Sequence, residues 1–130
     1  MIPGGLRIFV AVEPIDMRCS IDGLVAAVAE RLKKDAAIER ALFVFANARR
    51  DRAKMVWRNK NCWSLLYARF DAGFRVTFPE AKDGVASVVI DARTLAAILD
   101  GTKKRPTSRE IVREARARVQ ISSPTSITER

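Results

Sequence analysis

The chain has 130 residues, of which 48% are hydrophobic and 30% are charged, and its formal net charge is +9 at pH 7. This length suffices for one sizeable core, and no apolar run approaches the roughly 18 residues that cross a bilayer, so we expect a cytoplasmic protein without a membrane anchor or secretion signal. Histidine is absent, which removes the commonest general base near neutral pH and the commonest metal ligand.

The first predicted elements are a buried strand and an amphipathic helix. Residues 6–12 form an apolar run that is interrupted only by Arg7, and Glu13-Pro14 ends it. From Ser20, which we interpret as an N-cap, apolar side chains recur at helical spacing. The apolar positions of this predicted helix are Ile21, Leu24, Val25, Val28 and Leu32.

A β-hairpin with a basic turn is expected next. The apolar runs 42–46 and 55–57 flank the polar segment 47–54, which is typical of two antiparallel strands joined by a solvated turn. Alternate residues of the second strand, 53–58, point to opposite faces of a sheet, so Lys54 and Arg58 make one face partly cationic.

The remaining part of the domain is predicted to contain further strands and a second helix. Strands are expected at 63–70, 74–78 and 85–90, and a helix is expected between Asp91 as N-cap and Gly101 as C-terminal stop. This order predicts an α+β fold over residues 1–101, with a mostly antiparallel sheet packed by one or two main helices.

Residues 102–130 are predicted to form a basic C-terminal extension. A basic linker precedes a Thr107 or Ser108 capping box with Glu110, and a thin apolar stripe favours a helix that ends in a disordered segment. The stripe is too thin for insertion into a membrane, and both a mobile charged tail and a binding arm fit the pattern.

Positive charge is concentrated in two segments. The net charge is −2 over residues 1–30, +7 over 31–60, −1 over 61–102 and +5 over 103–130. This asymmetry favours a polyanionic partner, and guanidinium groups bind phosphate bidentately, although a solvated turn whose arginines pair with Asp51 fits as well. The predicted nucleic-acid contacts are Arg49, Arg50, Arg52, Lys54, Arg58 and Lys60.

Three aromatic residues lie close in sequence to these cations. Trp57, Trp63 and Tyr67 are candidates for stacking on unpaired bases. Their alternation with Met55 and Leu65 favours burial in the core as the competing interpretation.

The connection between the first strand and helix carries Asp16, Arg18 and Asp22. Paired carboxylates can hold a metal for phosphoryl transfer, but Arg18 can neutralise Asp16, and Asp22 suits the first turn of a helix. We therefore predict that the protein is not an enzyme and has no metal site or cofactor. Cys19 and Cys62 are expected to be reduced, largely buried thiols.

An ordered set of motifs resembles a known family. The set begins with Val12 to Arg18 and Asp22 to Leu24, continues through Leu42 to Phe45, Asn47, Arg49 to Asp51 and Lys54, and ends with Trp63 and Leu65 to Tyr67. Together these motifs resemble the TnpB-type accessory protein that is encoded by the second reading frame of insertion-sequence-66 elements. The resemblance covers about residues 6–79 and recurs more weakly at 91–101.

The resemblance implies a small bacterial protein that transposition requires together with companion proteins, while a larger transposase carries out strand transfer. We predict a non-catalytic accessory protein that binds DNA at the element ends through its basic hairpin and is nucleoid-associated when bound. The alternative is a subunit that assembles or recruits the transposase without touching DNA.

Overall fold

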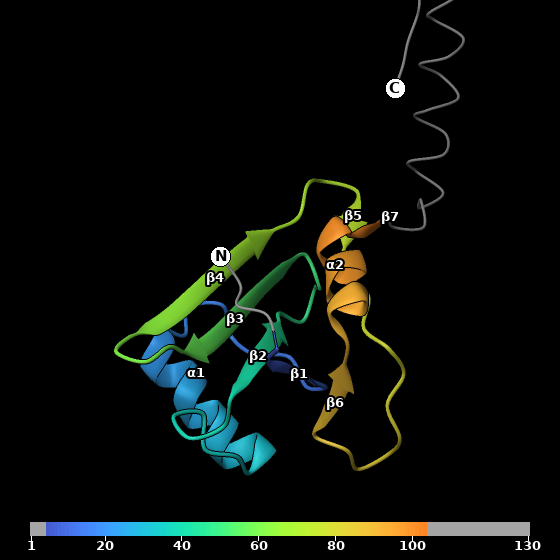
Figure 1. The fold of residues 1–130 in the computed structure, drawn as a ribbon. Coiled ribbons are helices and arrows are strands. Elements are labelled where there is room, and N and C mark those ends of the chain that lie inside the picture. The colour runs from blue at the N-terminus through green and yellow to red at the C-terminus, as the bar shows by residue number, and fades with distance from the viewer. Residues whose placement is uncertain (1–4, 104–130) are drawn as a thin grey trace, which may run out of the picture.

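A computed structural model describes residues 5–103 (Figure 1). Its elements are β1 (Arg7–Ala11), α1 (Ile21–Ala27), the π-helical turn η1 (Val28–Leu32), β2 (Ala41–Ala46), β3 (Arg52–Arg58), β4 (Trp63–Arg69), β5 (Phe74–Arg75), β6 (Ser87–Ile90), α2 (Ala92–Asp100) and β7 (Thr102–Lys103). Five strands form one sheet in the order β4-β3-β2-β1-β6, and β5 pairs with β7 in a second, two-stranded sheet.

The predicted α+β fold is confirmed. In the large sheet β1 and β2 pair in parallel, because α1 crosses between them, whereas β1–β6, β2–β3 and β3–β4 are antiparallel. The sheet is therefore mostly antiparallel, as predicted. The boundary at residue 101 stays a prediction, and the predicted helix after residue 106 lies outside the described residues.

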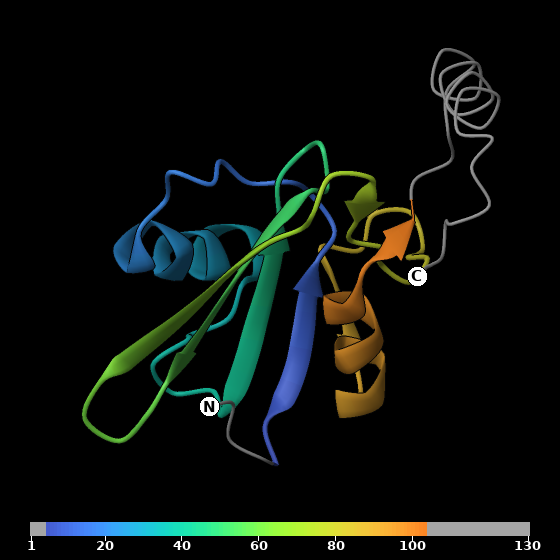
Figure 2. The same ribbon diagram turned by 90° about the horizontal axis from the view of Figure 1, so that it is seen from above.

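The helices lie on opposite sides of the large sheet (Figure 2). On the α1 side, Leu24 and Val28 pack on Phe9 and Phe43, whose rings stack with centroids 5.5 Å apart. On the α2 side, Leu95 packs in a cluster of Ile8, Val10, Leu42, Val44, Met55 and Trp57. Since β2 is covered on both sides, all six of its residues are buried, which explains its uninterrupted apolar sequence.

The ends of α2 match the sequence prediction, while those of α1 match it in part. The Asp91 carboxylate accepts a hydrogen bond from the Thr94 amide at 2.7 Å, and Gly101 ends α2 with a φ of 81°. Ser20 does precede α1, but its side chain makes no capping hydrogen bond.

Two further expectations are corrected. The predicted strand 74–78 is only two residues long, because the Val76 amide donates instead to the carbonyl of Arg50 at 2.6 Å and the Val76 side chain packs with Ile98 of α2. Cys19 and Cys62 are free thiols, as expected, but Cys19 is only half-buried and Cys62 is exposed in the β3–β4 turn.

The strands β3 and β4 extend from one edge of the molecule as a hairpin (Figure 1). No strand in the described part of the chain pairs with the outer edge of β4. Leu65 and Tyr67 are exposed on this strand, by 37% and 48%. The hairpin therefore offers both a side-chain face and a backbone edge to a partner.

Candidate nucleic-acid interface

The basic turn between β2 and β3 is held by the side chain of Asn47. Its Oδ1 accepts hydrogen bonds from the amides of Asp51 and Arg52, both at 3.1 Å, and its Nδ2 donates to the Asp51 carboxylate at 2.6 Å. Asn47 and Asp51 therefore fix the shape of the turn and do not serve as phosphate contacts. Arg49 lies at the exposed tip of the turn.

Arg50 differs from the other predicted contacts in its backbone conformation and in the direction of its side chain. Its φ of 61° is in the left-handed region, where a residue other than glycine is strained by on the order of 1 kcal/mol. Its guanidinium carbon lies 5.0 Å above the centre of the Phe78 ring. Phe78 packs with the α2-side core, so Arg50 extends away from the side of the sheet that carries α1.

We call the α1 side of the β3–β4 hairpin the hairpin face. It consists of the cross-strand pairs Arg52 with Arg69, Lys54 with Tyr67, Val56 with Leu65, and Arg58 with Trp63. Val56 is fully buried in the α1-side core, and the exposed members are Arg52, Leu65, Tyr67 and Arg69. Three of the six predicted cations, Arg52, Lys54 and Arg58, lie on this face. Lys60 is exposed in the turn at the far end of β3, and the seven residues of that strand separate this turn from the tip that carries Arg49.

Two cations of the hairpin face are already engaged within the protein. The Lys54 ammonium donates to the carbonyl of Cys19 at 2.8 Å and lies 5.4 Å from the centre of the Tyr67 ring. The Arg58 guanidinium lies 5.2 Å from the centre of the Trp63 ring. Lys54 is therefore committed to holding a loop in place, whereas Arg58 is positioned by an aromatic ring and keeps its donors for a ligand.

Arg69 is a surface cation that the sequence prediction missed. It lies directly opposite Arg52, and both side chains are exposed. Like charges directly opposite each other in an antiparallel pair destabilise a sheet, so an anion bound between these two side chains would stabilise it. Arg69 could be placed only from the register of β3 and β4. The turn at 59–62 sets this register and brings residue 69 opposite residue 52.

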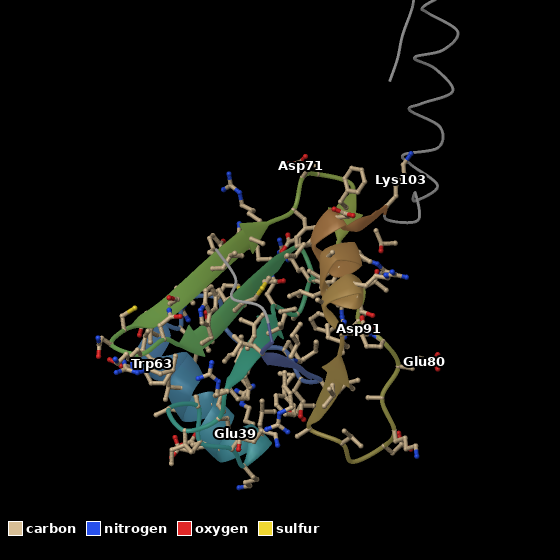
Figure 3. The ribbon with its side chains drawn as sticks, in the orientation of Figure 1. Glu39, Trp63, Asp71, Glu80, Asp91 and Lys103 are labelled. Atoms are coloured by element: carbon tan, nitrogen blue, oxygen red, sulfur yellow. The ribbon has the colours of Figure 1, made fainter. Side chains whose placement is uncertain are left out.

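The three aromatic candidates have different environments. Trp57 is only 4% exposed and packs between Leu42 and Met55 on the α2 side, so it belongs to the core. Trp63 is partly buried against the α1-side core, at the far end of the hairpin (Figure 3). Tyr67 is 48% exposed on the hairpin face, which leaves it as the aromatic ring most accessible to a base.

Arg18 and Asp16 form an ion pair within the loop before α1. The Arg18 guanidinium pairs with the Asp16 carboxylate, with Nη2 2.8 Å from Oδ2, and the Arg18 amide donates to Oδ1 at 2.8 Å. These hydrogen bonds lower the pKa of Asp16 to about 2. The amide of Ile15 donates to β2 and the Lys54 ammonium of β3 donates to the carbonyl of Cys19, so both bonds attach the loop to the sheet. Asp16, Arg18 and Lys54 therefore have structural roles in holding this loop.

Two findings concern the described residues as a whole. Between residues 5 and 103, no three acidic or cysteine side chains come close enough together to hold a metal ion. No helix in the same range has the length and apolar character needed to span a membrane.

Comparisons with known proteins give one family match and two similar proteins. A family model described as IS66 Orf2-like protein matches residues 6–109. The chain is 34% identical over 108 residues to uncharacterized protein y4jC of Sinorhizobium fredii, covering 81% of this chain and 91% of that protein. It is 31% identical over 103 residues to uncharacterized protein y4hO of the same organism, covering 78% and 86%. No solved structure gives a significant match.

Proposed function

Because this chain belongs to the IS66 Orf2-like family, whose role in transposition is an accessory one, we propose that it is a non-catalytic protein that binds DNA through the hairpin face. The observation that carries the proposal is the exposed Arg52–Arg69 pair beside Tyr67. A protein that did not bind an anion there would gain stability by changing either arginine.

The spacing of the available cations suits a phosphate backbone. Seven residues of β3 at about 3.3 Å each span about 23 Å, and duplex DNA carries one phosphate per about 3.4 Å of axis on each strand. The hairpin is thus about as long as seven base-pair steps of a duplex. Five cations remain available along it, and they are Arg49, Arg52, Arg58, Lys60 and Arg69.

Salt dependence of binding tests this proposal. With five phosphate contacts, the logarithm of the association constant should fall against the logarithm of salt concentration with a slope near −4.5, since each contact contributes about −0.9. Fluorescence anisotropy of labelled duplexes from the element ends measures this slope. Binding that ignores salt, or no binding at low salt, would reject direct DNA contact.

A second function is favoured by the unpaired outer edge of β4. An extended segment of the transposase could add to this edge as a strand, with the exposed Leu65 and Tyr67 beside it. This version predicts that the isolated protein ignores DNA but co-purifies with the transposase. Changing Leu65 or Tyr67 to proline removes an outward-pointing amide donor of β4. The amides of Ser64, Leu66 and Ala68 are unsuitable for this test, because the alternation set by the bonds from Asn59 to Cys62 and from Phe70 to Asp51 directs them toward β3.

A further inference from the structure

A cavity of about 380 Å³ lies beside the basic turn, at the end of β1 and on the side of the sheet opposite the hairpin face. Its floor is apolar and includes Val10, Val12 and Val88. Its rim comes from the turn and from the segment after β5. The amide of Val76 donates to the carbonyl of Arg50 at 2.6 Å, which fastens the two parts of the rim together.

The charged lining of this cavity is mainly positive. Arg50 and Arg75 both line it, and the acidic residue among the lining is Glu80. Glu80 is exposed, and Figure 3 shows its carboxylate on the outer side of its loop. The two guanidinium groups therefore set the electrostatic character of the cavity, and guanidinium binds phosphate oxygens in a bidentate manner.

The backbone of the turn is strained in the way that directs Arg50 toward this cavity. Its left-handed φ of 61° and the contact of its guanidinium with the Phe78 ring fix the side chain at the boundary between this cavity and a smaller hollow of about 90 Å³. Strained residues of this kind concentrate at ligand sites. Asparagine or glycine would adopt the same backbone conformation with less strain, but neither carries a guanidinium group.

We propose that this cavity binds a phosphate monoester, with Arg50 and Arg75 contacting the phosphate and the apolar floor receiving the group attached to it. The volume is within the range of about 300–1,000 Å³ that small-molecule sites occupy. Two sources have this chemistry: a free nucleotide and the 5′-phosphate at the end of a DNA strand. The site is separate from the hairpin face, so this proposal can be tested independently of duplex binding at that face.

The test follows the arginine Nε–Hε resonances of the full chain by NMR during titration with adenosine 5′-monophosphate, inorganic phosphate and adenosine. We expect the two phosphate compounds to shift the resonances of Arg50 and Arg75 and adenosine to leave them in place. Arg75→Gln should weaken binding of the monophosphate about tenfold, as the loss of one charge-assisted hydrogen bond implies. Arg50→Asn should act similarly while tolerating the left-handed backbone, and Arg40→Gln, at an exposed site outside the cavity, should bind as the wild type does.

A second arm identifies the source of the phosphate. A single strand with a 5′-phosphate that binds about tenfold more tightly than the same strand with a 5′-hydroxyl, with the difference lost in Arg75→Gln, assigns the site to DNA ends. Equal binding of the two strands assigns it to a free nucleotide. Unmoved Arg50 and Arg75 resonances, or an Arg75→Gln variant that binds the monophosphate normally, would overturn the proposal, whatever duplex DNA does at the hairpin face.

Discussion

Replacing Arg69 by glutamine separates the stability of the hairpin from its binding function. Arg69 and Arg52 are directly opposite each other, and both are exposed. Removing one charge relieves their repulsion, which solvent screens, so the free energy of unfolding should rise by about 0.2–0.5 kcal/mol. For a domain of about 100 residues this corresponds to a rise of about 1–4 °C in melting temperature.

The same substitution should weaken DNA binding. One of five phosphate contacts is lost, so the slope of log association constant against log salt should change from about −4.5 to about −3.6. The effect should be similar for every duplex sequence, because phosphate contacts carry no sequence information. A substitution that raises stability and weakens binding indicates that the original residue serves binding at a cost in stability.

Circular dichroism melts and fluorescence anisotropy at several salt concentrations measure the two effects on the same sample. Arg40→Gln is the matched control, because it removes the same charge at an exposed position outside the hairpin face. A lower melting temperature for Arg69→Gln would mean that Arg69 stabilises the fold. An unchanged salt slope would remove Arg69 from the proposed interface.

Three other predictions concern the turn, the helix stop and the loop before α1. Asn47→Ala removes the half-buried hydrogen bonds of the turn and should cost about 1–3 kcal/mol in chemical denaturation; a loss below about 0.5 kcal/mol would contradict the role given to Asn47. Gly101→Ala should lower the free energy of unfolding by about 1–3 kcal/mol more than Gly84→Ala does. Both glycines have a φ of 81°, but only a Cβ at Gly101 would contact the Phe70 ring, at 2.9 Å. Equal losses in the two variants would show that this overlap is not the cause. Asp16 should titrate near pH 2 by NMR, and its pKa should return toward 3.8 in Arg18→Gln. Since folding lowers this pKa, the contribution of Asp16 to stability should be full above about pH 4 and disappear as the pH falls toward 2. An unchanged titration in Arg18→Gln would contradict this.

The sequence predicts the elements of this fold well where local chemistry determines them. The capping carboxylate of Asp91 and the left-handed Gly101 mark α2 correctly, because both depend on residues within one turn of the helix. The β2–β3 hairpin is also predictable, since apolar runs flank a turn that Asn47 closes by itself. The uninterrupted apolar character of β2 reflects its cover on both sides, which the sequence pattern suggests but does not assign to particular helices.

Features that depend on long-range packing are harder to predict. The alternation of β4 is blurred because an edge strand is partly exposed on both faces, and without its register Arg69 cannot be placed opposite Arg52. Strand alternation places Trp57 on the same side of β3 as Met55, but the burial of that side depends on α2, which follows about 35 residues later in the chain. The segment 74–78 alternates like a strand, yet Val76 packs against α2.

The predicted cations also divide for reasons that only the fold reveals. Lys54 is close to the loop before α1 in space and bonds to Cys19, which is 35 residues away in sequence. Arg50 turns to the opposite side of the sheet because its own backbone is left-handed. Counting charges along the basic segment therefore overstates how many of its side chains are available to one ligand.

The most direct test of the DNA-binding proposal compares two double charge reversals of equal net charge. Arg52→Glu with Arg69→Glu places the change on the hairpin face, whereas Arg40→Glu with Arg93→Glu places it at exposed positions elsewhere on the surface. We predict that the first variant loses measurable binding to element-end duplexes at moderate salt while the second keeps binding, weakened only by the general change in charge. Equal losses in the two variants, with both folded by circular dichroism, would contradict the claim that the hairpin face is the DNA-binding surface.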